Sequence, residues 1–488
     1  MNFGVVTKVL GNLLLIEALI LAIPLLVAVL CGEPAAVAFA WSVVITAVVG
    51  AVLRLIDVNS EAQKPKANTI KAREGILIVT LGWVLASLFG ALPFVFTQAV
   101  PTFADAFFES VSGLTTTGAT VIDNVESLPR SILFWRSFSH WIGGMGILVF
   151  TLAVLPALGI GGMQIFKAES PGPTADKLVP RLANTAKLLY TVYLGITVLG
   201  TFVLRLSGLP IFESLTLSLG TVGTGGFSGF NNSISVLSDN VFAIWAISVL
   251  MIVSGVNFGL YYELWQRRWH VLRVNTELKW YLAIIAVSSL LIAVNVYLTS
   301  GGELLEHVRN AVFQVGSIIT TTGYFSVDFN QWPAFSKGIL ALLMFIGGSA
   351  GSAAGGMKVI RVVTAGKLIR REINQMLHTH ALVPITVNGR VVPQETVSAI
   401  AAFLLLYVAI FGGSTLLVSL AGYDLSSAAI TVSATMNNVG LGLGMVGPGH
   451  SFSVFSSALK VFLSALMLLG RLELFTMLVI ASPGFWKQ

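Results

Sequence analysis

The sequence predicts an all-α polytopic membrane protein built from four similar units around one pseudo-fourfold pore. Three observations lead to this fold class. Hydrophobic residues make up 55% of the 488 residues and charged residues only 10%, whereas a soluble domain carries about 25% charged residues. Apolar runs long enough to cross a bilayer recur along the chain, and a short glycine-containing motif occurs four times between them. With a mean hydropathy of +0.87, most of the surface is expected to face lipid.

Ten runs are long enough to be transmembrane helices, since about 20 apolar residues cross the hydrocarbon core. We expect these spans at 9–30, 36–56, 76–98, 131–156, 184–206, 240–262, 279–299, 335–360, 396–420 and 453–480. Four shorter, half-apolar segments lie between them, at 103–117, 209–222, 306–322 and 425–439. Because each is too short to cross, we expect four re-entrant pore loops. Their irregular backbone is tolerated at membrane depth only inside protein or beside a water-filled cavity.

The distribution of basic residues predicts the orientation of these spans. The connections 54–74, 160–187, 263–279 and 358–395 hold 19 of the 28 Lys and Arg residues, and the segments that carry the re-entrant loops hold five. Basic loops face the cytoplasm, so both termini are expected there and all four re-entrant loops should enter from outside. The net charge of +6 therefore reflects membrane orientation rather than nucleic-acid binding. The single cysteine, Cys31, excludes a disulfide framework.

The four re-entrant segments resemble one another. They read FESVSGLTTTG at 108–118, FESLTLSLGTVG at 212–223, FQVGSIITTTG at 313–323 and ITVSATMNNVG at 430–440, the second with one inserted residue. Each lies between two spans, so the predicted unit is span, short pore helix, glycine-containing filter strand, span. The expected organisation is a two-span hairpin at 1–75, followed by pore repeats at 76–183, 184–276, 277–394 and 395–488. The third repeat has an interrupted second span.

Four such strands that meet at one axis would bind a dehydrated cation; the alternative is plain packing loops. An uncompensated ion in hydrocarbon costs on the order of tens of kcal/mol, which backbone carbonyls and Thr hydroxyls can offset. Glycine permits positive φ and close approach of four backbones, and the C-terminal ends of the pore helices favour a cation. The candidate ion-binding residues are Thr116, Thr117, Gly118, Thr221, Val222, Gly223, Thr321, Thr322, Gly323, Asn438, Val439 and Gly440.

Several motifs resemble a known family. TTTGAT at 115–120, GTVGTGGFS at 220–228, TTTGYFS at 320–326, NNVGLG at 437–442, HWIGGMG at 140–146 and GRLELF at 470–475 resemble the Trk/Ktr/HKT superfamily of potassium transporters, and its TrkH branch most closely. The resemblance implies potassium uptake across the bacterial cytoplasmic membrane, with K⁺ as the transported ion. Gly118, Gly223, Gly323 and Gly440 would be the key glycines of a selectivity filter. It also implies a homodimer and a cytosolic ring of nucleotide-binding regulatory subunits of the RCK/KTN type (TrkA-like), with any nucleotide on that partner.

A run of small residues, GGSAGSAAGG at 347–356, interrupts the span at 335–360. Each glycine disfavours helix by about 1 kcal/mol relative to alanine, so we expect a loop below the filter; small-residue packing in an unbroken helix is the alternative. By the resemblance this loop is the candidate gate. Arg471 is expected to line the inner cavity beside it, because an intramembrane charge usually faces a pore or partner, or else to snorkel to the headgroups. The candidate gate residues are Gly347, Gly348, Gly351, Gly355, Gly356 and Arg471.

The remaining signals are weaker. The basic stretch from Lys358 to Arg390 would dock the regulatory subunit, or reflects only topology and lipid contact. Gly442–Gly447 matches the dinucleotide pattern but follows no predicted strand. No nucleotide-binding, nucleophile or paired-carboxylate motif appears, so we do not expect an enzyme. A carrier coupling K⁺ to H⁺ or Na⁺ is the alternative function. Such carriers often use inverted repeats and midplane acids, whereas these repeats are parallel and only Glu17 and Glu473 lie within apolar runs.

Overall fold

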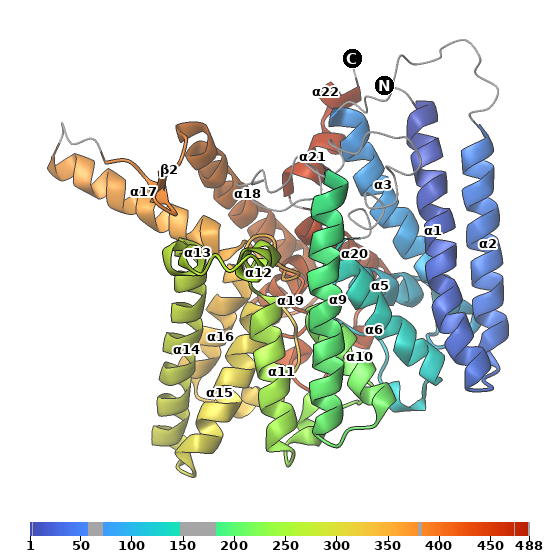
Figure 1. The fold of residues 1–488 in the computed structure, drawn as a ribbon, viewed down its shortest axis with the longest axis horizontal. Coiled ribbons are helices and arrows are strands. Elements are labelled where there is room, and N and C mark those ends of the chain that lie inside the picture. The colour runs from blue at the N-terminus through green and yellow to red at the C-terminus, as the bar shows by residue number, and fades with distance from the viewer. Residues whose placement is uncertain (2, 57–71, 147–181, 379–382, 473, 487–488) are drawn as a thin grey trace.

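The computed structural model describes residues 1, 3–56, 72–146, 182–378, 383–472 and 474–486. Helices α1 (Phe3–Leu30) and α2 (Ala35–Leu55) form a hairpin at one side of the molecule (Figure 1). Their backbones touch, since a methyl group at Gly11 would lie 2.7 Å from the carbonyl oxygen of Gly50. Small residues allow this close approach between membrane helices.

The rest of the described chain repeats one arrangement of helices four times. A long helix comes first: α3 (Ala72–Gly90, followed by α4, Leu92–Phe96), α9 (Leu182–Leu206), α14 (Thr276–Ser300) and α18 (Gln394–Ser419). A short helix follows: α5 (Phe103–Leu114), α10 (Ile211–Val222), α15 (Leu304–Ile319) and α19 (Leu425–Met436). A third helix closes each unit: α6 (Arg130–Gly144), α11 (Val241–Ser254), α16 (Ala334–Ile346) and α20 (Ser457–Arg471).

Polar side chains determine where several of these helices begin. Each accepts a hydrogen bond from a backbone N–H of the first turn, which has no partner within the helix. The capping residues and the helices that follow them are Thr102 (α5), Asn240 (α11), Asn275 (α14), Asp424 (α19) and Ser456 (α20). Short 3₁₀ helices lie at 125–127, 233–237, 329–331, 444–446 and 452–454.

The protein is mostly helical and polytopic. In the part of the chain that the structure describes, six helices are long and apolar enough to cross a membrane. They confirm the spans predicted at 9–30, 36–56, 184–206, 279–299 and 396–420 as single helices, and the span at 76–98 as α3 continued by α4. The core is one large apolar cluster that joins α1 and α3 to α14, α19 and α20, with smaller clusters around α9 and α11.

The predicted spans that close each unit are not continuous helices. The span predicted at 240–262 bends by 92° between α11 and α12 (Phe258–Trp265), and that at 453–480 is divided into α20 and α21 (Leu474–Ala481). The span at 335–360 breaks after Ile346, and this is the one span for which the sequence predicted an interruption. At 131–156, α6 ends at Gly144 and residues 147–156 lie outside the described residues. Hydropathy averages over these breaks, so it predicts one span where the backbone turns.

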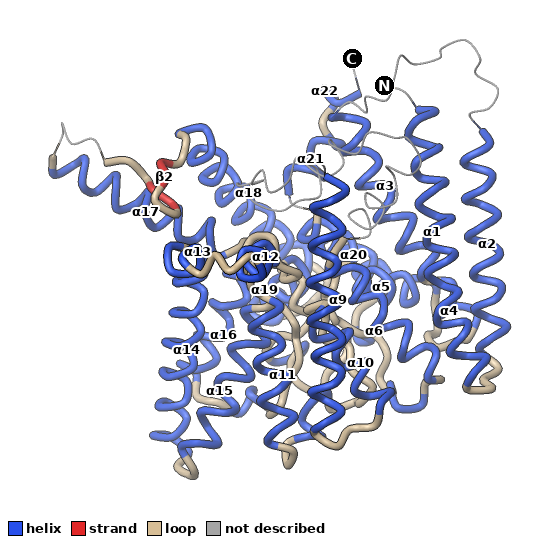
Figure 2. The backbone as a smooth tube through the Cα atoms, viewed as in Figure 1, coloured by secondary structure: helices blue, strands red, loops and turns tan. Residues whose placement is uncertain are grey.

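Beyond the break in the third unit, α17 (Val359–Leu377) projects away from the bundle, as Figure 1 shows. It leads to a two-stranded antiparallel hairpin, β1 (Thr386–Val387) and β2 (Arg390–Val391), which the all-α prediction did not include. The short helices α13 (His270–Val274) and α22 (Pro483–Trp486) complete the described elements. Figure 2 shows helix almost everywhere, with irregular backbone gathered among the short helices at the centre of the molecule.

Candidate functional site

The four short helices α5, α10, α15 and α19 end in the same way. After the last turn comes one residue with φ of 55°: Thr116, Thr224, Thr321 and Asn438 respectively. The next backbone N–H donates to the carbonyl five residues earlier, over 2.9, 3.0, 2.8 and 2.9 Å; the pairs are Thr117 to Ser112, Gly225 to Gly220, Thr322 to Ser317 and Val439 to Ala434. A glycine with positive φ follows each time: Gly118, Gly226, Gly323 and Gly440. Four segments distant in sequence therefore share one backbone geometry.

These four glycines form a closed ring of contacts. A methyl group at Gly118 would lie 2.0 Å from the carbonyl oxygen of Gly225, and one at Gly226 would lie 2.1 Å from that of Thr322. The same contact joins Gly323 to Val439 at 2.1 Å and Gly440 to Thr117 at 2.0 Å, which returns to the first segment. Only glycine fits at such a distance from a neighbouring backbone. We call residues 116–118, 224–226, 321–323 and 438–440 the ring.

The predicted second segment of this ring was wrong by three residues. Thr221 and Val222 belong to helix α10, and Gly223 has a helical φ of −69°. The ring instead contains Thr224, Gly225 and Gly226. The sequence alignment paired Phe212 with Phe108 by inserting one residue. In the structure the residue ten positions before the ring glycine Gly226 is Thr216, just as Phe108 is ten positions before Gly118. The aromatic residue that follows Gly226 and Gly323, Phe227 and Tyr324 respectively, was the available signal.

Three threonines in the ring have a strained backbone. Thr116, Thr224 and Thr321 are β-branched residues in the left-handed region, which such residues rarely occupy. Strain of this kind costs about 1–3 kcal/mol per residue and persists where the surroundings impose it. Asn438, which tolerates positive φ more easily, donates from Nδ2 to Thr117 Oγ1 (3.0 Å) and to the Met467 carbonyl (2.9 Å). All four side chains are fully buried.

A buried polar network connects the helices α5 and α6 to the segment that follows Gly226 of the ring. Arg136 Nε donates to Glu109 Oε1 over 2.9 Å, Nη1 donates to the carbonyl of Ser228 over 3.1 Å, and the guanidinium lies 4.1 Å from the ring centroid of Phe227. His140 accepts from the Phe227 backbone N–H over 3.1 Å and also contacts the Gly113 carbonyl at 2.8 Å. These contacts join α5 and α6 to the chain that follows Gly226, so they fix one segment of the ring against the next.

Two acidic residues near the ring, Glu109 and Asp105, are buried rather than exposed to solvent. Glu109 is completely buried beside Arg136, and Asp105 is buried against Lys460 with an Nζ–Oδ1 distance of 2.6 Å. A buried charge persists when it is paired and hydrogen-bonded. Sequence spacing could not predict these pairs, because Lys460 lies 355 residues from Asp105.

The predicted interruption at 347–356 forms a loop, residues 347–358, directly against the ring. Its ends meet, since a methyl group at Gly347 would lie 2.4 Å from the Gly355 carbonyl oxygen and 2.9 Å from the α-carbon of Gly356. The Gly355 N–H donates to Thr321 Oγ1 over 2.6 Å. Gly348 packs near the Gly255 carbonyl and Gly351 against the side chain of Asn257, at the break between α11 and α12. Packing of small residues within an unbroken helix is thereby excluded.

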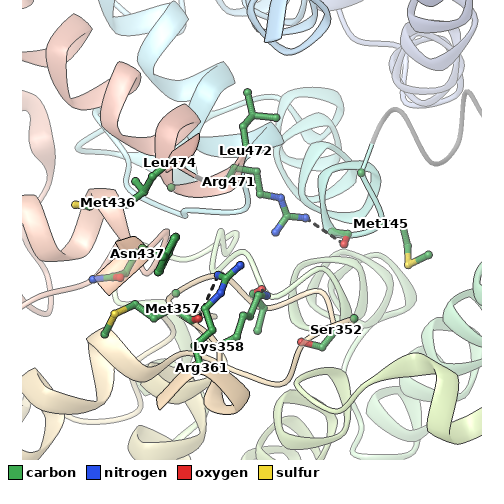
Figure 3. A pocket seen from close by; sticks show the side chains of 18 of the residues that line it. Met145, Ser352, Met357, Lys358, Arg361, Met436, Asn437, Arg471, Leu472 and Leu474 are labelled. Atoms are coloured by element: carbon green, nitrogen blue, oxygen red, sulfur yellow. Dashed lines mark hydrogen bonds between the residues drawn. The ribbon is translucent and has the colours of Figure 1, made fainter. Parts of the chain in front are cut away.

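Arg471, the last residue of α20, contacts this loop. Its Nη1 donates to the carbonyl of Ala353 over 3.0 Å, and its Nη2 donates to that of Gly144 over 3.1 Å and to that of Gly143. Figure 3 shows its guanidinium directed toward the backbone beside Met145, in a cavity that Lys358 and Arg361 also line. The structure thus brings Arg471 to the loop and to the end of α6.

Comparison with known proteins identifies the family. The model of the TrkH family, described as cation transport protein, matches residues 37–487. The chain belongs to this family. Its members are transporters, not enzymes. The Trk system potassium uptake protein TrkH of Escherichia coli K12 is 37% identical over 498 residues, and that of Salmonella typhimurium is 36% identical over 496, both covering 100% of each chain. The crystal structure of the potassium transporter TrkH from Vibrio parahaemolyticus superposes with a TM-score of 0.87 at 34% identity over 100% of both chains.

Proposed function

We propose that this TrkH-family chain takes up potassium ions through a pore whose selectivity filter is the ring. The closed glycine ring is the observation that carries the proposal. It brings twelve residues from four segments together at the ends of four helices, whose C-terminal dipoles favour a cation. Carbonyl oxygens can then replace the water of a dehydrated ion. The filter residues are Thr116, Thr117, Gly118, Thr224, Gly225, Gly226, Thr321, Thr322, Gly323, Asn438, Val439 and Gly440.

The proposed architecture is a two-span hairpin at 1–75 and four pore repeats at 76–183, 184–276, 277–394 and 395–488 around one pseudo-fourfold axis. The four shared helix ends support this division. Counting the broken spans as crossings gives ten transmembrane helices, with α5, α10, α15 and α19 as re-entrant pore helices. The chain is proposed to lie in the bacterial cytoplasmic membrane with both termini in the cytoplasm, in agreement with the distribution of Lys and Arg.

The loop 347–358 and Arg471 are the proposed gate. The hydrogen bond from Gly355 to Thr321, which joins the loop to the ring, supports this proposal. A loop in that position would obstruct an ion that leaves the ring. Arg471 adds a positive charge beside the same loop and so would raise the energy of a passing cation. Gly347, Gly351 and Gly356, all with φ near 75°, give the loop its turns.

The proposed assembly is a homodimer with one pore per subunit and a cytosolic ring of RCK/KTN-type (TrkA-like) nucleotide-binding subunits. The relatives named above are Trk system proteins, which supports a multi-subunit uptake system. The projecting helix α17 and the hairpin β1–β2, with exposed Arg370 and Arg390, are the proposed docking surface. Any nucleotide would bind to the partner, with K⁺ as the ion bound by this chain.

The test is ⁸⁶Rb⁺ flux into liposomes that contain the purified protein. Saturable flux that Na⁺ competes poorly, lost in Gly323→Ser and raised by deletion of 347–356, is the expected result. Flux that requires an imposed proton gradient would instead favour a K⁺/H⁺ carrier. One observation favours that second candidate: both carboxylate oxygens of Glu17 in α1 are buried and have no hydrogen-bond partner among the residues that the structure describes. Glu17→Gln would then abolish flux.

A further inference from the structure

The loop 347–358 is held from one side by a carboxylate that the repeat motifs did not single out. Glu277 lies in the first turn of α14 and is buried, with 7% of its surface exposed. Its Oε1 accepts two hydrogen bonds, from the N–H of Ala350 over 2.8 Å and from the N–H of Ile360 over 3.2 Å. One oxygen atom therefore joins the middle of the loop to the helix that follows it.

This contact replaces the missing N-terminal cap of α17. The residue before the helix, Lys358, has φ of 74° and makes no capping hydrogen bond with its side chain. The first two N–H groups of α17 are satisfied by other segments: Val359 donates to the Gly348 carbonyl over 3.0 Å, and Ile360 donates to Glu277. A carboxylate at a helix N-terminus is stabilised both by these orphan donors and by the helix dipole. The helix α17 and the loop thus depend on Glu277 together.

The neighbouring residue connects the same point to the cytoplasmic hairpin. The Thr276 N–H donates to Asn388 Oδ1 over 2.7 Å, and the Asn388 N–H donates to Thr276 Oγ1 over 3.1 Å. Asn388 is in the turn between β1 and β2. Lys367 on α17 also donates to the Thr386 carbonyl over 2.6 Å. The first turn of α14 is therefore a junction between the exposed hairpin and the buried loop.

We propose that Glu277 is a positioning residue that clamps the loop 347–358 against the ring, and that Thr276 and Asn388 couple this clamp to the cytoplasmic hairpin. The inference rests on the proposed function, in which the loop is the gate. A displacement of the hairpin would act on α14 at Thr276. This residue directly precedes Glu277, whose Oε1 accepts the hydrogen bond from the Ala350 N–H. The clamp and the filter are separate, because Glu277 contacts the loop and α17 and not the ring.

The first test measures the position of the loop without measuring transport. In full-length protein with Cys31→Ser, Ser352→Cys gives one thiol in the loop, facing the cavity beside Arg471. Glu277→Ala leaves the Ala350 and Ile360 N–H groups unpaired, and we expect the rate of modification by a charged thiol reagent to rise at least about fivefold, as for the loss of a helix cap.

The control variants separate the clamp from a general loss of charge. Glu277→Gln keeps a carbonyl oxygen and should react like the parent. Glu395→Ala, an exposed acidic residue in the first turn of α18, is the matched control. Equal reactivity of Glu277→Ala and the parent would overturn the clamp.

The second test is ⁸⁶Rb⁺ flux in the same variants. Glu277→Ala should raise flux, and the increase should disappear when 347–356 is already deleted; an equal increase in the deleted background would overturn the proposal. If the deletion itself leaves flux unchanged, the gate assignment fails, while the thiol reactivity still decides the clamp. Glu277→Asp, whose carboxylate is one methylene shorter, gives the same measurement if Glu277→Ala does not assemble.

A third test addresses the contact between the hairpin β1–β2 and the first turn of α14. Asn388→Ala removes the two hydrogen bonds between Thr276 and Asn388. We expect it to raise the thiol reactivity of Ser352→Cys when Glu277 is present, and to cause no further increase when it is combined with Glu277→Ala. Reactivity that stays at the parental rate in Asn388→Ala, or that adds fully to the effect of Glu277→Ala, would overturn the coupling and leave the clamp alone.

Discussion

Gly355 donates its backbone N–H to Thr321 Oγ1 at 2.6 Å, so the loop 347–358 and the ring share a direct hydrogen bond. Thr321 is also one of the ring residues with φ of 55°. One side chain therefore belongs both to the strained backbone of the ring and to the contact that holds the loop beneath it.

Removal of this hydroxyl should release the loop. A hydrogen bond of this kind contributes about 1 kcal/mol, which corresponds to about a fivefold change in an equilibrium. We expect Thr321→Ala to raise ⁸⁶Rb⁺ flux by about that factor and Thr321→Ser, which keeps the hydroxyl, to leave it near the parental value. A similar increase in both variants would assign the effect to the backbone of residue 321 instead.

Substitution in the corrected segment of the ring should alter ion selection. A methyl group at Gly226 would lie 2.1 Å from the Thr322 carbonyl oxygen, so Gly226→Ala must displace the neighbouring segment. We expect the Rb⁺/Na⁺ flux ratio to fall at least about tenfold, since carbonyl positions set selectivity. Gly229→Ala is the control, because its nearest atom is Leu133 Cδ1 at 3.9 Å. An unchanged ratio in assembled Gly226→Ala protein would contradict the register of the ring.

The buried pair of Arg136 and Glu109 should contribute strongly to stability. Glu109→Gln leaves a guanidinium that is 2% exposed without its counter-charge, and breaking a buried pair in this way costs about 3–5 kcal/mol. We expect a lower melting temperature of the purified protein in detergent. Glu306→Gln is the comparison, because Glu306 is 54% exposed in its pair with Arg309 and such pairs contribute about 0–1 kcal/mol. Equal effects would show that the Arg136 charge finds another partner.

Asp424 should make the stability depend on acidic pH. Hydrogen bonds from the hydroxyl of Ser426 and the hydroxyl and backbone of Ser427 lower the pKa of the Asp424 carboxyl from 3.8 to about 2. Its contribution is therefore fully present above about pH 4 and is lost as the pH falls through about 2. Asp424→Asn keeps a capping oxygen but does not titrate. Thermal melting between pH 6 and 2 should therefore show a smaller acid loss in this variant, and identical profiles would contradict the assignment.

Much of the fold could be predicted because membrane helices are selected by hydropathy and length. The hairpin α1–α2 and the long first helix of each unit are confirmed in this way. The breaks between α11 and α12 and between α20 and α21 were not predicted, because long apolar runs lie on both sides of Gly255 and of the stretch 471–473. A backbone that turns inside protein keeps the hydropathy of a straight span.

The site was predictable only where residue type and backbone geometry coincide. Gly118, Gly323 and Gly440 have positive φ and occur in similar motifs, so sequence similarity located them. In the second segment the phenylalanine of the motif misled the alignment, and Gly226 was located by its positive φ and its contact with Thr322. Glu277 gave no local signal, since its two partners lie 73 and 83 residues away.

The four segments of the ring are encoded at four separate places in one gene. A mutation in a homotetramer alters every quadrant at once, whereas here a single codon alters one quarter of the ring. The αL position already shows the result, with threonine in three quadrants and Asn438 in the fourth. A single-chain ring can therefore diverge stepwise, each quadrant being tested by selection while the other three are unchanged.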